Sequence, residues 1–135
     1  MSSHAFILEF QLKASIEEVM GLLTDEDLIE AWSGGSSLIE KFEGGKFIMF
    51  DGWVEGKVMK ITEDELAYTW KPSDWSEDTS PSSVHYKFIK EGYETKIILE
   101  HRGFPDKKEM ESHKSGWTEH FFGPIEAYLA NEKVR

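Results

Sequence analysis

The sequence predicts a single α+β domain in which a curved, seven-stranded antiparallel sheet wraps around a long C-terminal helix, in the order β-α-α-β6-α. Three observations support this fold class. Apolar and polar residues alternate near the N-terminus and again over residues 36–103, which is typical of strands with one buried face. Two short amphipathic segments separate these alternating regions. Residues 106–134 instead repeat their apolar positions in steps of three and four, the period of a helix.

The composition narrows the classes of function. With 135 residues and 39% hydrophobic content, the chain has the size and makeup of one globular domain. A net charge of -11 opposes binding to phosphate backbones, and no basic run exceeds Lys107 and Lys108, so nucleic acid is not an expected partner. The lack of cysteine in the sequence excludes disulfides and thiolate chemistry. Without a signal peptide or an apolar run that could span a bilayer, we expect a cytoplasmic protein with no membrane partner.

The N-terminal region is expected to contain one strand and two short helices. Residues 5–13 carry an apolar side chain at every second position and predict the strand. Ser15 followed by Glu18 is a capping box, which marks the start of the first helix. Thr24 or Asp25 caps the second helix, and two consecutive glycines end it.

Residues 36–103 are predicted to form six antiparallel strands in a meander. Turn signals rich in Gly, Asp and Pro recur at regular intervals through this region. The strands are expected at roughly residues 36–42, 46–51, 53–62, 66–71, 83–90 and 95–102. Alternation gives the last three strands a shared apolar face made of Leu66, Tyr68, Trp70, Val84, Tyr86, Phe88, Ile97, Leu99 and His101. We expect this face to be buried.

The C-terminal segment is predicted to be one long helix with a broad aromatic stripe. The stripe consists of Met110, His113, Trp117, Phe121, Ile125 and Tyr128. Gly116, Gly123 and Pro124 are poor helix formers, so burial of the stripe must hold the segment helical. Pro124 also crowds the carbonyl of His120, which predicts a kink. Only this helix is long enough to cover the apolar face of the sheet.

Several motifs follow one another in a characteristic order after Trp32, which ends the second helix. They are Gly44-Gly45-Lys46-Phe47, Asp51-Gly52-Trp53-Val54-Glu55-Gly56-Lys57-Val58, Leu66-Ala67-Tyr68-Thr69-Trp70, His101-Arg102-Gly103-Phe104 and His113-Lys114-Ser115-Gly116-Trp117. With the order of the elements, they resemble the START-like (SRPBCC) superfamily and its helix-grip fold. Within it, the chain looks most like the family named for the activator of the heat-shock-protein-90 ATPase. The resemblance covers nearly the whole chain, whereas the eukaryotic activators resemble it in one domain only. It implies an apolar cavity between sheet and helix, which the superfamily uses for lipids, hormones or polyketides.

Eight residues are candidates for the lining of such a cavity. They are Trp32, Trp53, Tyr68, Trp70, His101, His113, Trp117 and Phe121. Aromatic rings offer a non-directional wall to an apolar ligand, and the polar edges of His, Tyr or Trp would orient its head group. The alternative is that these side chains simply fill the core, which is the usual role of a helix stripe such as Trp117 and Phe121. Tyr68 and Trp70 fit either interpretation equally.

His101 and His113 are the polar candidates within this set. An imidazole in an apolar cleft can serve as a general acid or base, whereas a histidine that only hydrogen-bonds a neighbour is the commoner case. A metal site from His113, His120 and a carboxylate is conceivable because residues seven apart return to nearly the same helix face, but no His-Glu-x-x-His pattern occurs. Nucleophile, phosphate-loop and dinucleotide motifs are absent from the sequence as well. We therefore expect neither a metal nor a cofactor.

Three functions remain open from the sequence. The first is a non-catalytic carrier or sensor that binds a small apolar ligand between the sheet and the C-terminal helix. The second is a stress-related, co-chaperone-like module that binds a chaperone or another protein. The third is a polyketide cyclase-like enzyme that uses His101, His113 or Tyr68. Small residues on the back of the last helix would allow a homodimer or a partner contact, although an ordinary solvated face explains them more economically.

Overall fold

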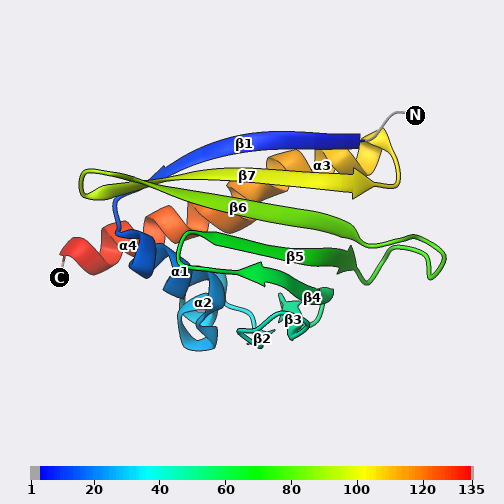
Figure 1. Cartoon of the computed structure of the whole chain (residues 1–135), viewed down its shortest axis with the longest axis horizontal. Helices are drawn as coiled ribbons and strands as arrows, with labels where there is room; N and C mark the ends of the chain where they lie inside the picture. Colours follow the sequence, from blue (N-terminus) through cyan, green and yellow to red (C-terminus); the bar gives the residue numbers. More distant parts are fainter. Residues whose placement is uncertain (1–3, 135) are drawn as a thin grey trace.

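The computed structural model describes residues 4–134 and confirms the predicted α+β architecture (Figure 1). Its elements in chain order are β1 (His4–Leu12), α1 (Ile16–Thr24), α2 (Glu26–Ser33), β2 (Leu38–Ile39), β3 (Lys46–Met49), β4 (Val54–Ile61), β5 (Glu65–Pro72), β6 (Ser82–Glu91), β7 (Glu94–Phe104), α3 (Lys107–Gly116), the π-helical segment η1 (Trp117–Phe122) and α4 (Gly123–Val134). Figure 1 shows α3, η1 and α4 running as one long helix along a face of the sheet, with α1 and α2 at one end. This is the predicted helix-grip arrangement.

The seven strands form one antiparallel sheet in the order β1-β7-β6-β5-β4-β3-β2. Strands β2 to β7 meander as predicted, and β1 pairs with β7 along its length, so distant parts of the chain lie side by side. Strand β2 is much shorter than the predicted residues 36–42. The residues on either side of β2 do not extend the strand because their backbone groups bond elsewhere. The Ser36 backbone N–H donates to Asp51 Oδ1 at 2.8 Å, and the Gly45 N–H donates to the Phe42 carbonyl in a turn.

Local capping fixes the two short helices. The Ser15 hydroxyl accepts from the Glu18 backbone N–H, and the Glu18 carboxylate accepts from the Ser15 N–H, each at 3.1 Å, which completes the predicted capping box. Asp25 caps α2 by accepting from two backbone N–H groups of its first turn. Thr24, the alternative cap, instead belongs to the last turn of α1. Gly34 ends α2 with a φ of 78°, a left-handed conformation that glycine adopts without strain.

The core lies between the sheet and the C-terminal helix. All nine side chains predicted for the shared face of β5, β6 and β7 are buried, and none exceeds 3% exposure. The helix contributes the predicted stripe: His113, Trp117, Phe121 and Ile125 are buried, while Met110 and Tyr128 are partly buried. The alternation and the helical stripe therefore identified the two surfaces that meet.

The C-terminal helix departs from regular α geometry where its sequence is least helical. Over η1 the backbone widens to π-helical geometry, and the Gly123 N–H donates to the Thr118 carbonyl, five residues earlier. Pro124 follows at once and has no N–H to donate. A wider turn relieves the crowding between the proline ring and the preceding carbonyls. The sequence predicted a kink at Pro124, and the structure has a π-helical segment immediately before it. Among residues 4–134, no helix has both the length and the apolarity needed to cross a bilayer.

Candidate functional site

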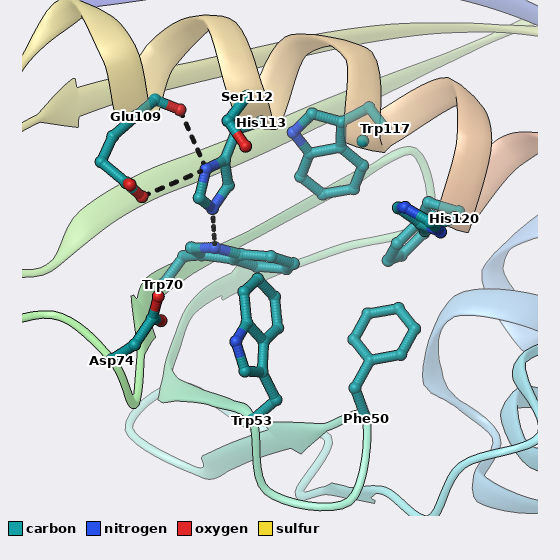
Figure 2. Close-up of a pocket in the computed structure, with 11 residues that line it drawn as sticks. Phe50, Trp53, Trp70, Asp74, Glu109, Ser112, His113, Trp117 and His120 are labelled. Carbon is teal, nitrogen blue, oxygen red and sulfur yellow. Dashed lines mark hydrogen bonds and ion pairs between the residues drawn. The ribbon is translucent and has the colours of Figure 1, made fainter.

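A pocket of about 300 Å³ opens at one end of the space between the sheet and the C-terminal helix (Figure 2). Its lining residues come from the β3–β4 turn, from β5 and the loop after it, and from α3 and η1. They are Phe50, Trp53, Trp70, Asp74, Glu109, Ser112, His113, Gly116, Trp117, His120 and Phe121. The pocket is aromatic on its walls and carries two carboxylates.

Five of these side chains form a closed circuit of aromatic contacts, which we call the aromatic cage: Phe50, Trp53, Trp70, Trp117 and Phe121. The ring centroids of Trp70 and Trp117 are 5.1 Å apart, and those of Trp117 and Phe121 are 4.6 Å apart. The remaining three steps, from Phe121 through Phe50 and Trp53 back to Trp70, each measure 6.2 Å. In Figure 2, Phe50 and Trp53 rise from the β3–β4 turn towards Trp117 on the helix. The sheet and the helix therefore build the cage together.

Five of the eight residues predicted to line a cavity do line this pocket, namely Trp53, Trp70, His113, Trp117 and Phe121. Trp32, Tyr68 and His101 lie instead in the packed interior. Trp32 packs against Phe121 with centroids 4.9 Å apart and donates its indole N–H to a backbone carbonyl of α1 at 2.8 Å. Tyr68 stacks on Phe47 at 3.8 Å. The structure thus brings five candidates together at the pocket and buries the other three in the core, although Trp32 also borders a separate shallow groove beside α4.

Tyr68 and Tyr86 hydrogen-bond to each other through their hydroxyl groups inside this core. Burial raises the pKa of both phenols, so both remain protonated at neutral pH. Each side chain is at most 1% exposed. The pair fills space and satisfies its own polar atoms, and neither hydroxyl faces the pocket.

His101 has both ring nitrogens committed to neighbours. The Trp117 indole N–H donates to Nδ1 at 3.0 Å, and an indole can only donate, so Nδ1 must accept. Nε2 therefore carries the proton and donates to the Ser82 hydroxyl oxygen at 2.8 Å, while that hydroxyl donates to the Trp70 carbonyl at 2.7 Å. Burial, together with the proximity of His113, lowers the pKa of His101 well below its usual value. The ring is thus a neutral structural link between β7, β6 and η1.

Both ring nitrogens of His113, on α3, are also hydrogen-bonded to neighbours. The Trp70 indole N–H donates to Nε2 at 3.1 Å, and Nδ1 donates to the backbone carbonyl of Glu109 at 3.0 Å (Figure 2). Burial lowers the pKa of His113, although the nearby carboxylates of Glu109 and Asp74 oppose this shift. Neither histidine presents a free ring nitrogen to the pocket. This geometry favours the structural interpretation of both residues over acid–base catalysis, and it also occupies the nitrogens that a metal site with His120 would need.

Four pocket residues were not among the candidates from the sequence: Phe50, Asp74, Glu109 and Ser112. Phe50 has a φ of 54°, in the left-handed region, so strand alternation does not predict where its ring points. Asp74 lies in the loop after β5, and Glu109 lies on α3, where the Trp75 indole N–H donates to its Oε1 at 2.7 Å. The one sequence signal for Phe50 is its position at the end of residues 46–50, a stretch of a predicted strand that is apolar on both faces.

This chain is similar to a family of proteins described as activators of the Hsp90 ATPase. The family described as Activator of Hsp90 ATPase homolog 1-like protein matches residues 13–130. Two relatives, each described as activator of 90 kDa heat shock protein ATPase homolog 1, come from Mus musculus and Homo sapiens. They are 31% and 30% identical to this chain over 112 residues, which is 82% of this chain and 32% of each relative. The chain thus spans about a third of the length of these relatives.

Solved structures extend the comparison. The crystal structure of an Hsp90 activator from Plasmodium falciparum matches with a TM-score of 0.85 and 29% identity, over 93% of this chain and 96% of that one. The solution structure of an Aha1 dimer from Colwellia psychrerythraea matches with a TM-score of 0.74 and 16% identity, over 93% and 94% of the two chains. Because its identity is low, this second likeness shows the fold alone.

Proposed function

Because the chain belongs to the family of Activator of Hsp90 ATPase homolog 1-like proteins, we propose that it is a protein-interaction module that binds a chaperone of the Hsp90 type. The observation that carries this proposal is the likeness to the Plasmodium falciparum Hsp90 activator, which extends over 96% of that chain at 29% identity. The relatives from mouse and human, also described as activators, support it over a shorter share of their length.

The packing of this domain is consistent with recognition at its surface. Buried side chains fill most of the space between the sheet and the helix, so a protein partner would have to bind to the outer surface of the domain. Three large apolar side chains between the start of β2 and the β3–β4 turn are exposed to solvent. They are Leu38, Phe42 and Trp53, with 38%, 57% and 40% exposure. We propose that these three side chains, which lie within sixteen residues of one another in the chain, contribute to one contact surface, because contiguous exposed apolar patches mark contact sites for other proteins.

Binding to the Hsp90-type chaperone of the same organism tests the proposal directly. We expect saturable binding by biolayer interferometry and a change in the steady-state ATPase rate of the chaperone. Phe42→Ser should weaken binding, whereas Tyr93→Ser is a matched control, because Tyr93 is 97% exposed in the turn after β6. Absence of binding would contradict the proposal. Equal binding by both variants would contradict its assignment to this surface.

A second candidate function is the binding of a small ligand in the pocket. The pocket itself favours this candidate, because it has about 300 Å³ of space and is lined by five of the eight residues predicted for a ligand site. Native mass spectrometry of the protein as expressed, followed by denaturing mass spectrometry, would reveal a bound molecule. A stoichiometric adduct released on denaturation supports ligand binding. A clean mass together with no response to added small molecules would argue against it.

A homodimer also fits features of the chain. Ala127 and Ala130 are exposed on α4 and line a shallow groove with Trp32 of α2 and Tyr128. The Colwellia psychrerythraea relative is described as a dimer. Light scattering coupled to size-exclusion chromatography measures the oligomeric state, and Ala130→Glu should shift a dimer that uses this groove towards monomer.

A further inference from the structure

We propose that the pocket binds a small, free organic cation that carries a quaternary or tertiary ammonium group, held against the faces of the aromatic cage. This inference rests on the second candidate function, ligand binding in the pocket, and names the chemical class of the ligand. Three features of the lining point to it: the aromatic rings, the sign of the charge and the size of the space.

The aromatic cage offers ring faces and few hydrogen-bond donors. The indole N–H groups of Trp70 and Trp117 point to His113 and His101, so these groups are already satisfied by the protein. The parts of the two indoles that line the pocket are therefore aromatic carbon and offer it no hydrogen-bond donor. The face of an aromatic ring carries partial negative charge, and several faces around one space attract a desolvated ammonium group. A ligand that relies on accepting hydrogen bonds therefore finds few donors in this lining.

The charged groups of the lining add to this preference. Asp74 and Glu109 are carboxylates, and none of the eleven lining residues is Lys or Arg. Glu109 is held in place by the indole N–H of Trp75 at 2.7 Å. The Nε2 atom of His113 accepts from the Trp70 indole and so carries no proton, and burial lowers the pKa of this ring, so His113 does not offset the two negative charges. A cation therefore gains Coulomb attraction in the pocket, whereas an anion is repelled and a purely apolar ligand gains nothing from the carboxylates.

The volume sets a limit on the ligand. About 300 Å³ is at the small end of the range for ligand pockets, and the interior beyond it is closed by Tyr68, Tyr86 and Trp117. A compact trimethylammonium group with a short tail fits this space, but a long acyl chain does not. The carboxylates also disfavour a phosphate next to the ammonium group, so the structure favours a free cation over a phosphocholine head group.

An NMR titration with choline and its neutral isostere 3,3-dimethylbutan-1-ol tests the proposal, because the two molecules share a shape and differ in charge. We expect choline to shift the indole N–H signal of Trp53 and to bind at least about ten-fold more tightly than the isostere. Trp53→Leu should weaken choline binding by about three- to thirty-fold, and Asp74→Asn by about three-fold. Tyr93→Leu removes an exposed aromatic ring away from the pocket and should leave binding unchanged.

The outcomes separate this inference from the broader proposal of ligand binding. Equal affinity for choline and the isostere would overturn the cation assignment and leave a pocket for neutral ligands. Binding of neither molecule would also overturn it and would count against ligand binding as a whole. Phosphocholine should bind more weakly than choline, and tighter binding of phosphocholine would overturn the assignment of a free cation.

Discussion

The two ends of the space between the sheet and the C-terminal helix use similar residues to opposite effect. At the closed end, Tyr68, Tyr86 and His101 are at most 1% exposed, and each polar side-chain atom has a partner. At the open end, Phe50 and Trp53 border the pocket, and Trp53 is 40% exposed. Trp117 contacts both ends. Aromatic residues alone therefore do not identify a binding site. The difference is whether their edges and faces are already used by the protein.

The largest expected difference between the two ends is in their contribution to stability. Trp117→Ala removes a ring that is 3% exposed and the donor to His101, so we expect the free energy of unfolding to fall by about 3–5 kcal/mol. Trp53→Ala should cost only about 1 kcal/mol because its ring is partly exposed already. Urea unfolding followed by circular dichroism measures both, with Tyr93→Ala as a surface control. Similar losses for the two tryptophans would break the comparison.

Acidification should destabilise the folded protein through two buried histidines, His101 at the closed end and His113 beside the pocket. Burial lowers the pKa of His101 and His113 in the folded protein, whereas in the unfolded chain both bind a proton below about pH 6.5. The free energy of unfolding is therefore unaffected by these two histidines above this pH. It decreases as the pH falls further, because the unfolded chain then binds protons that the folded protein does not. The expected loss is up to about 1.4 kcal/mol per pH unit for each histidine.

Urea midpoints measured from pH 8 to pH 5 test this pH dependence. His101→Gln keeps an acceptor and a donor but cannot ionise, so the slope below pH 6.5 should decrease even if the variant is less stable overall. An unchanged slope would show that His101 does not contribute to the acid sensitivity.

The hydroxyl of Ser82 gives a smaller and more local test. Ser82→Ala leaves the Nε2–H of His101 buried without its acceptor and removes the bond to the Trp70 carbonyl. We expect a loss of about 1–3 kcal/mol in the free energy of unfolding. Ser82→Thr retains the hydroxyl and serves as the matched variant. A loss under about 0.5 kcal/mol for Ser82→Ala would mean that the network contributes little to stability.

Two glycines of the C-terminal helix give the smallest effects, and these have opposite signs. A Cβ at Gly116, beside the pocket, comes no closer than 3.9 Å to His120. Gly116→Ala should therefore stabilise the protein by up to about 1 kcal/mol. A Cβ at Gly123 would lie 2.6 Å from the Thr118 carbonyl oxygen, so Gly123→Ala should destabilise it. Thermal melts distinguish the signs, and stabilisation by both variants would show that the π-helical turn relaxes easily.

Much of the candidate site was within reach of sequence reasoning because it lies on regular elements. Trp70 and His113 were placed by the alternation of β5 and by the helical stripe, and both line the pocket. Phe50, Asp74 and Glu109 were not identified. The direction of the Phe50 ring follows from the left-handed backbone conformation of that residue, which strand alternation does not predict. Asp74 and Glu109 are far apart in the chain and line the same pocket only because α3 packs beside the loop after β5.

The sequence by itself determined the fold class, the faces of the strands, the cap of α1 and the stripe of the C-terminal helix, and it narrowed the cap of α2 to two neighbouring residues. Each of these depends on residues that are close in the chain, so a local period or a short motif reveals it. Only the tertiary structure decided how much of the space between sheet and helix stays open. That depends on how side chains from distant segments share the volume. Tyr68 and His101 point into the same space as Trp70, but Phe47, Tyr86 and Ser82 close around them and leave the pocket at the Trp53 end.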